Sequence, residues 1–352
     1  KKTNYWRIWS KWKRKYERKT DNLLEEDNSK INKKYIIISA ICALVILVIV
    51  LILVFTVFSK DKDSNNPDQA SEDNTQIDTI PPEEMNKARQ SFTQLNFTEN
   101  SKVLSYNLFV PENYTNEIKY PLVLFISDKS LVGKEVTAPI TQTVGGPIWA
   151  TDTVQKKHQC FVLVPQYNEG VVDGTWNKSE YLNITLNLIS KLEEQYNIDK
   201  NRIYGTGQSM GAMATLYLLA NHQDLFAAGL IADGHWLLEQ LYGLVNATFT
   251  FFAAEGDPNP FNTQNEVKEY FKNNSYPFST LELINARENA EVLNNKVDTM
   301  YKEGNKQNFI SFSKGTVVNP GSEGKGEHMA SFKFAYRLER VRDWIFEQVK
   351  KE

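Results

Sequence analysis

Cysteine is nearly absent from this 352-residue chain, which contains only Cys42 and Cys160. Cys42 lies in a long apolar run and Cys160 opens a separate apolar segment, so a disulfide between them is not geometrically plausible. His and Cys do not cluster anywhere at metal-ligand spacing. The chain therefore lacks the sequence signature of a disulfide scaffold or of a metal site, and we expect no bound metal.

Charge and proline are missing from residues 36–58, which are almost entirely Ile, Leu, Val, Ala and Phe. At about 1.5 Å per residue this run is long enough to span the hydrocarbon core of a bilayer, so a transmembrane helix is predicted here. A cleaved signal peptide is the alternative. Its apolar region would be shorter, however, and no small-x-small cleavage site follows residue 58.

The two flanks of this run differ in charge. Residues 1–34 carry 12 Lys or Arg and 5 Asp or Glu, whereas residues 59–84 carry 2 Lys and 8 acids. The positive-inside rule therefore predicts a single-pass protein of the cell membrane, with segment 1–35 cytoplasmic and the rest of the chain extracellular. The basic, Trp-rich start favours an amphipathic segment on the anionic inner leaflet over nucleic-acid binding, so no nucleic acid is expected as a partner. Residues 59–88 are predicted to be a disordered extracellular linker.

In residues 89–352, short apolar runs alternate with segments whose apolar residues recur at helical spacing. The runs at 121–126 and 160–165 are continuous, as in strands that a parallel sheet buries on both faces. Helical spacing occupies residues 179–196 and 330–350. The pattern predicts an α/β domain whose mostly parallel sheet has helices on both faces. Further strands are expected at 91–95, 103–110, 203–206, 226–232, 248–254 and 309–312, and a further helix at 144–157.

Ser209 stands in the sequence Gly207-Gln208-Ser209-Met210-Gly211, between a short strand and an Ala-rich helix. G-x-S-x-G in this strand-turn-helix context is typical of a nucleophile elbow. The glycines are required because side chains there would collide with the neighbouring strand and helix. The turn also leaves the N–H of Met210 free at the start of the helix, where it can stabilise an oxyanion. We therefore predict that Ser209 is a nucleophile.

A serine nucleophile needs a base, and histidine is scarce: among 4 in the chain, only His235 and His328 follow Ser209 by more than one helix. His328 lies in a Gly-rich loop before the last helix. Because the expected order along the chain is serine, acid, histidine, His328 is the predicted base. Asp257, after the strand at 248–254, is the predicted acid, with Glu255 as its competitor.

Several nearby residues are predicted to complete the pocket. His235 precedes any late acid, so we expect it to line the pocket or cap a helix. Gln208 and Trp236 are also predicted as substrate-binding residues. The second oxyanion donor is expected from the loop after residue 126, as the main-chain N–H of Asp128 or Lys129.

Taken together, residues from about Tyr106 to Trp344 resemble the α/β-hydrolase family. Within it they are similar to bacterial esterases related to poly(3-hydroxybutyrate) depolymerases and to feruloyl or acetyl-xylan esterases, most specifically in the phrase around Ser209. The resemblance implies hydrolysis of a small-molecule or polymeric ester by Ser209, Asp257 and His328, without a cofactor.

The sequence departs from this family in two places. The family's His-Gly at the start of the oxyanion loop is replaced by Ser127-Asp128. Residues 259–286 look inserted, and their aromatic residues suggest a lid; a surface decoration is the alternative. Two other functions stay open. A peptidase of the prolyl-oligopeptidase type shares the order of the triad but usually brings a propeller domain, and a surface binding protein could use a hydrolase scaffold whose oxyanion hole is impaired.

Overall fold

The computed structural model describes residues 80–322 and 326–350. The predicted cytoplasmic segment, the predicted membrane span at 36–58 and most of the predicted linker lie outside these residues. Within the described part, no helix combines the length and the apolar character needed to cross a membrane.

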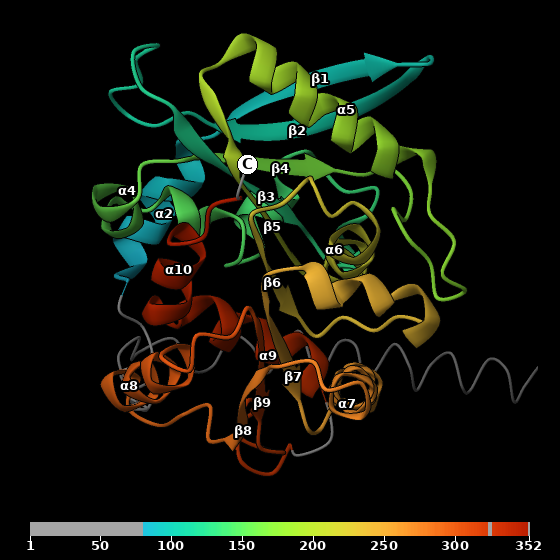
Figure 1. Cartoon of the computed structure of the whole chain (residues 1–352). Helices are drawn as coiled ribbons and strands as arrows, with labels where there is room; N and C mark the ends of the chain where they lie inside the picture. Colours follow the sequence, from blue (N-terminus) through green and yellow to red (C-terminus); the bar gives the residue numbers. More distant parts are fainter. Residues whose placement is uncertain (1–79, 323–325, 351–352) are drawn as a thin grey trace, which may run out of the picture. The chain divides into compact units, whose positions relative to one another are not determined.

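A nine-stranded sheet organises the described residues (Figure 1). Its strands run in the spatial order β1-β2-β4-β3-β5-β6-β7-β9-β8. Only the pairings of β1 with β2 and of β2 with β4 are antiparallel, so the prediction of a mostly parallel sheet is confirmed. In chain order the strands are β1 (Thr93–Glu99), β2 (Lys102–Phe109), β3 (Tyr120–Ile126), β4 (Phe161–Gln166), β5 (Ile198–Gln208), β6 (Ala228–Ala232), β7 (Phe249–Ala254), β8 (Ser279–Ile284) and β9 (Gln307–Phe312).

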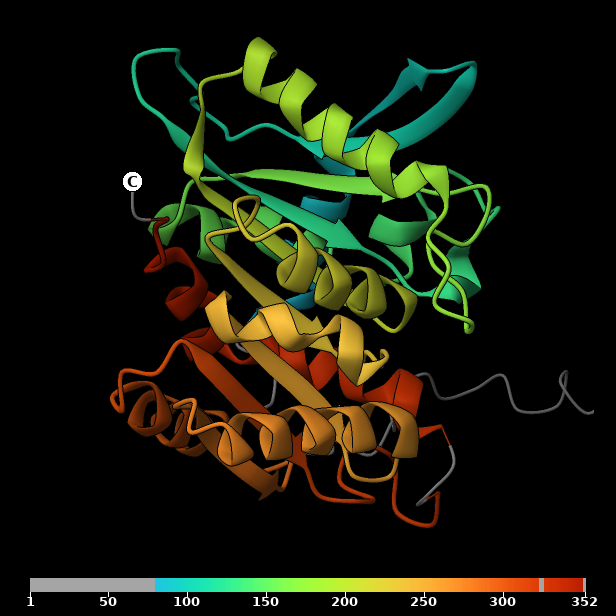
Figure 2. The same ribbon diagram turned by 45° about the vertical axis from the view of Figure 1, so that its right-hand side comes forward.

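Helices cover both faces of the sheet, as predicted. One face is covered by α5 (Glu180–Gln195), α6 (Met210–Asn221) and α7 (Pro258–Asn273), which lie at the front in Figure 2, with the golden segment that follows β6 between α6 and α7. The other face is covered by α2 (Pro82–Gln90), α3 (Ala138–Thr141), α4 (Asp152–Lys157), α8 (Ala290–Tyr301), α9 (Glu327–Arg337) and α10 (Glu339–Phe346). Four short 3₁₀ helices complete the connections: η2 (Lys129–Leu131), η3 (Pro147–Ala150), η4 (Leu238–Gln240) and η5 (Tyr242–Asn246).

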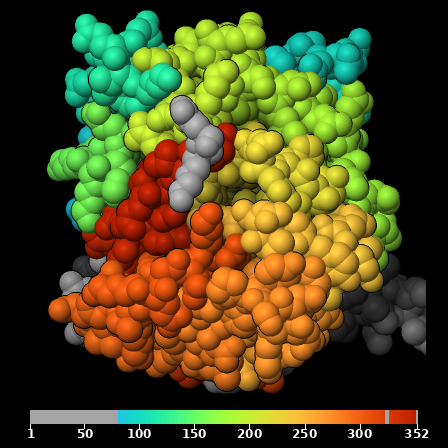
Figure 3. All heavy atoms as spheres, viewed as in Figure 1, coloured from blue at the N-terminus to red at the C-terminus, as the bar shows by residue number. Residues whose placement is uncertain are grey.

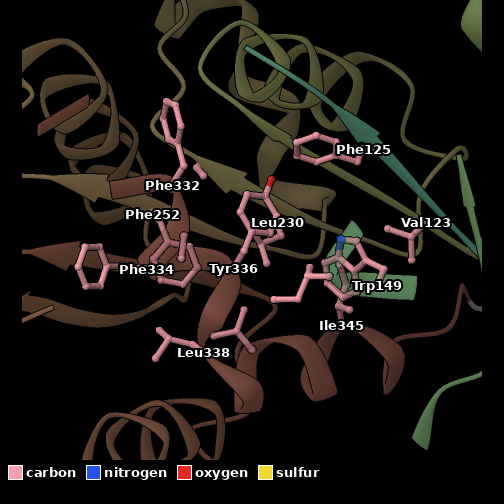
Figure 4. Close-up of a cluster of buried hydrophobic side chains, with 14 of the residues drawn as sticks. Val123, Phe125, Trp149, Leu230, Phe252, Phe332, Phe334, Tyr336, Leu338 and Ile345 are labelled. Carbon is pink, nitrogen blue, oxygen red and sulfur yellow. The ribbon is translucent and has the colours of Figure 1, made fainter. Parts of the chain in front are cut away.

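The core on the α9 face joins the centre of the sheet to the C-terminal helices. The large side chains packed there are Val123, Phe125, Trp149, Leu230, Phe252, Phe332, Phe334, Tyr336, Leu338 and Ile345 (Figure 4). The hydroxyl of Tyr336 is hydrogen-bonded to Thr206 of β5 at 2.7 Å, which satisfies both polar groups inside the core. Helix α9 is thereby fixed against the strand that carries Ser209. On the surface, the red C-terminal residues lie between green and orange segments (Figure 3).

Two predicted boundaries are wrong. Helix α2 occupies residues that were assigned to the disordered linker. Pro82 is its first residue, acidic residues lie in its first turn, and its side chains Met85 and Ala88 are buried. The single helix expected over 330–350 is two helices, because Leu338 adopts an extended conformation with φ −68° and ψ 106° between α9 and α10.

Residues 259–286 are neither a lid nor a surface decoration. They form α7 and the edge strand β8, which pairs in parallel with β9. Phe271 of α7 is fully buried and packs against Phe309 of β9. The segment is thus a helix and a strand that extend the sheet at its edge, and among its aromatic residues Phe271 belongs to the core, whereas Tyr276 is exposed.

Candidate active site

Ser209 sits at a sharp turn between β5 and α6, with φ 52° and ψ −116°. A side chain on either flanking glycine would destroy this turn. A Cβ on Gly211 would lie 1.8 Å from the carbonyl oxygen of Ile126, and a Cβ on Gly207 would lie 2.3 Å from the main chain of Gly211. The strained backbone at Ser209 is thus held by close packing of the two glycines against β3 and α6.

The structure brings Ser209, His328 and Asp257 into one hydrogen-bonded chain. Nε2 of His328 lies 2.7 Å from Oγ of Ser209, and Nδ1 of His328 is hydrogen-bonded to Oδ2 of Asp257. Asp257 follows β7 directly, and His328 is the second residue of α9. The competing acid, Glu255, instead accepts a hydrogen bond from the main-chain N–H of Lys314 at 2.9 Å. The residues meet because the strands that precede Ser209 and Asp257 end at the same edge of the sheet.

The carboxylates around His328 govern its proton affinity. Burial works to lower the pKa of the His328 imidazole, but the hydrogen bond and charge of Asp257 outweigh it, aided by the charges of Asp233 and Asp128. The net effect is a pKa raised above the ordinary histidine value. An imidazole held in this way can accept a proton from the Ser209 hydroxyl and be stabilised as the imidazolium.

Asp233 is a second carboxyl group near the hydrogen-bonded residues Ser209, His328 and Asp257. It was not identified from the sequence. It follows β6, is fully buried, and adopts a left-handed φ of 53°. Its Oδ1 accepts the N–H of Ala254 at 2.8 Å, and its Oδ2 is hydrogen-bonded to the hydroxyl of Ser331. Ser331 also donates to the carbonyl oxygen of His328 at 3.0 Å. Asp233 therefore connects the ends of β6 and β7 to the helical turn that carries His328.

The oxyanion loop is organised by the side chain of Asp128, which is 3% exposed. Its carboxylate accepts the N–H of Ser130 at 2.9 Å and caps η2, and it also accepts Nε2 of Gln208 at 2.7 Å. Met210 is the first residue of α6, so its N–H is one of the unpaired donors at the helix start. The carboxylate of Asp128 is thus held by the main-chain N–H of Ser130 and by the side-chain amide of Gln208.

The three predicted substrate-binding residues have different surroundings. Gln208 is buried and engaged with Asp128, as described above. His235 is partly buried; burial lowers its pKa, while charges on Asp257 and His328 act on it in opposite directions, so it lies within electrostatic reach of that pair. Trp236 is different: it is 3% exposed and its indole N–H donates to Gln240 at 3.2 Å. The prediction that Trp236 binds substrate is wrong, because it is a core residue.

A pocket of about 480 Å³ lies on the surface at α2 and α4, but a smaller one of about 380 Å³ borders the site itself. The wall of the smaller pocket includes Asp128, Gln208 and Met329, the residue after His328. Among the described residues, no group of three His, Cys, Asp or Glu could hold a metal ion. The site therefore consists of the predicted nucleophile, base and acid, hydrogen-bonded to one another, and an adjoining pocket.

The chain is similar to known proteins in both sequence and structure. A model of the prolyl oligopeptidase family matches residues 170–286. Acetylxylan esterase A of Emericella nidulans is 40% identical over an 85-residue alignment that covers 21% of this chain and 27% of that protein. A probable acetylxylan esterase A of Aspergillus flavus is 34% identical, with the same coverage. A thermostable esterase of known structure superposes with a TM-score of 0.58 and 26% identity over 75% of this chain and 64% of its own. The chain is an esterase-like protein of the α/β-hydrolase fold.

The family match at 170–286 includes Ser209 and Asp257 and ends before His328. His328, the predicted base, lies on α9, beyond that region. The chain also spans about a quarter of the length of the curated relatives it matches, and 64% of the thermostable esterase. Its own reaction and substrate are therefore inferred from its site.

Proposed function

We propose that the protein is a serine ester hydrolase that works through an acyl-enzyme. The observation that carries this proposal is the placement of His328, whose two ring nitrogens engage Oγ of Ser209 at 2.7 Å and the carboxylate of Asp257. Base and orienting acid are thus already aligned on the nucleophile without any ligand.

The reaction follows from this alignment. Nε2 of His328 takes the hydroxyl proton of Ser209 as Oγ attacks the ester carbonyl, and Asp257 stabilises the imidazolium that forms. The N–H of Met210, together with that of Asp128 or Lys129, holds the oxyanion. His328 then gives its proton to the leaving alcohol. Water attacks the acyl-enzyme with the same assistance, which releases the acid and restores Ser209.

The substrate class is a carboxylic ester, small or polymeric. Proteins named acetylxylan esterase are among the relatives, which supports esters of carbohydrates as the first compounds to test. Esters of the poly(3-hydroxybutyrate) type are the polymeric alternative, in line with the resemblance around Ser209. Neither reaction requires a cofactor.

We place this activity outside the cell, on a single-pass membrane protein. The apolar run at 36–58 and the charge difference between its flanks support a cytoplasmic N-terminus and an extracellular hydrolase domain. Protease protection of residues 1–35 in sealed cells, with cleavage of residues 80–350, would support this topology. Loss of residues 1–35 under the same conditions would contradict it.

A serine peptidase is the second candidate, because the family model that matches residues 170–286 is that of prolyl oligopeptidases. The same triad chemistry cleaves amides when the His328 proton reaches the leaving amine. Parallel assays on peptide anilides separate the two. Hydrolysis of proline anilides with kcat/KM above that for any ester would replace the esterase proposal.

The direct test measures hydrolysis of p-nitrophenyl esters from acetate to decanoate by the full chain. We expect turnover that falls by about 10³- to 10⁶-fold in Ser209→Ala and in His328→Ala. Glu255→Gln is the matched control, since Glu255 is adjacent to Asp257 but bonded to Lys314, and it should retain most activity. A folded wild-type protein that turns over no ester would favour the binding-protein alternative.

A further inference from the structure

The pocket of about 380 Å³ beside the site has a wall built by several parts of the fold. It is bounded by α2, by η2 of the oxyanion loop, by residues 141–144 after α3, by Gln208 and by the first two turns of α9. Its polar lining includes hydroxyl, amide and cationic groups, and Leu131 and Phe332 contribute apolar walls. The pocket adjoins the site, since its lining includes Gln208, which precedes Ser209, and Met329, which follows His328.

Arg89 lines this pocket with a charge that no carboxylate neutralises. Among the described residues, it donates hydrogen bonds to Oδ1 of Asn86 at 3.0 Å and to the carbonyl oxygen of Thr143 at 3.4 Å, and both acceptors are neutral. The side chain is partly buried, and burial and the nearby charge of Arg337 both lower its pKa. A guanidinium in such a position is costly unless an anion joins it.

The acid in the same pocket does not fill this role. Asp128 also lines the pocket, but its two oxygens already accept hydrogen bonds from Ser130 and Gln208. No ion pair joins it to Arg89 among the described residues. The pocket also contains Lys333 from α9, so two cationic side chains and one engaged carboxylate line it.

We propose that this pocket selects esters that carry a carboxylate, which Arg89 binds while Ser209 attacks the ester carbonyl. The inference rests on the proposed ester hydrolase function and adds the chemical class of its substrate. A planar guanidinium with two free terminal N–H groups matches a carboxylate in a paired geometry. The carboxylate can belong to the acyl half or to the alcohol half of the ester, and both are tested.

Two pairs of substrates distinguish a carboxylate on the acyl half of the ester from one on the alcohol half. On the acyl side, mono-p-nitrophenyl adipate is compared with the p-nitrophenyl ester of adipamic acid, in which a neutral amide replaces the carboxylate. On the alcohol side, 4-carboxyphenyl acetate is compared with 4-carbamoylphenyl acetate. For the full chain at pH 7.5, we expect the anionic member of one pair to have a kcat/KM at least about 10-fold higher than its amide.

Arg89→Gln should lower kcat/KM for the preferred anionic ester by about 10- to 100-fold and change that for its amide by less than about 2-fold. Arg89→Lys, which keeps the charge without the planar fork, should give an intermediate loss. Lys87→Gln is the matched control, since it removes a cation from the same helix that is paired with Asp152 at 2.7 Å and does not line this pocket.

The absence of an anionic preference in both pairs would overturn the inference. Equal losses on the anionic ester and its amide in Arg89→Gln would also overturn it, because they would show a structural role. In both cases the wild type still turns over the neutral esters, so the proposed hydrolase function would stand. If the wild type turned over none of the four esters, the proposed function itself would fail, and this inference with it.

Discussion

The buried carboxyl group of Asp233 should make the protein less stable as the pH rises. Asp233 is fully buried, and burial raises its pKa from 3.8 to about 7, although the hydrogen bonds from Ser331 and Ala254 act against the shift. Replacing it with asparagine keeps the size and the acceptor for the N–H of Ala254. The new amide can donate to the Ser331 hydroxyl, which still donates to the carbonyl of His328.

The sign and size of the effect follow from proton linkage. Between pH 4 and 7 the folded protein keeps a proton on Asp233 that the unfolded chain releases, so the free energy of unfolding falls as the pH rises. A shift of about three pKa units corresponds to roughly 4 kcal/mol in total, of which about 2 to 3 kcal/mol falls between pH 5 and 8. Asp233→Asn cannot ionise and should lack this loss.

Urea unfolding of the wild type and of Asp233→Asn at pH 5, 6, 7 and 8 measures the effect. His328 titrates in both proteins, so its contribution cancels in the difference except for the part of its pKa shift that the charge of Asp233 causes. We expect the variant to gain about 2 to 3 kcal/mol relative to the wild type between pH 5 and 8. Ser331→Ala keeps Asp233 but removes a hydrogen bond that lowers its pKa. In this variant the free energy of unfolding should therefore fall more steeply with pH than in the wild type. Profiles of the wild type and Asp233→Asn that stay parallel within about 0.5 kcal/mol would refute this reasoning.

Three further predictions concern the site and the core. Asp257→Asn should lower kcat by about 10⁴-fold. Because Asp257 raises the pKa of His328, the variant should also move the acid limb of the residual activity to lower pH. An unmoved acid limb in the pH-rate profile would contradict this. Gly211→Ala should unfold at a urea concentration well below that of the wild type, since its Cβ would lie 1.8 Å from the carbonyl oxygen of Ile126; an unchanged midpoint would show that the turn can relax. Cys160 is fully buried with its pKa raised to about 12, so a disulfide reagent at pH 8 should modify it only after unfolding, and rapid reaction in the native protein would argue against this packing.

The central elements were predictable because their residues are buried on both faces. Strands such as β3, β4 and β7 are continuous apolar runs, and each of the eight predicted strands overlaps an observed one. Strand β8 was missed because it is an edge strand, in which only Ser279 and Ile284 are buried. Helix α2 was missed because its polar sequence buries only Met85 and Ala88, a pattern close to that of a linker.

The residues of the site were predictable only where a motif or an order along the chain identified them. The glycines of a local motif identified Ser209, and the scarcity of histidine pointed to His328. Asp233 had no such signal, because its partner Ser331 is 98 residues away and the pairing exists only once α9 is packed on the sheet. Trp236 follows His235, a predicted pocket residue. An aromatic residue in such a place can bind substrate or belong to the core, and the residues packed around it decide which role it has.

Covalent labelling of Ser209 tests the central claim most directly. The full chain is treated with a fluorophosphonate at pH 7.5, and the adduct is located and timed by mass spectrometry, beside Ser209→Ala and His328→Ala. The account predicts one adduct, on Ser209, which is absent in the first variant and forms at least about 10²-fold more slowly in the second, because His328 takes the proton of the attacking hydroxyl. Equal labelling rates with and without His328, or an adduct on another residue in Ser209→Ala at the wild-type rate, would contradict it.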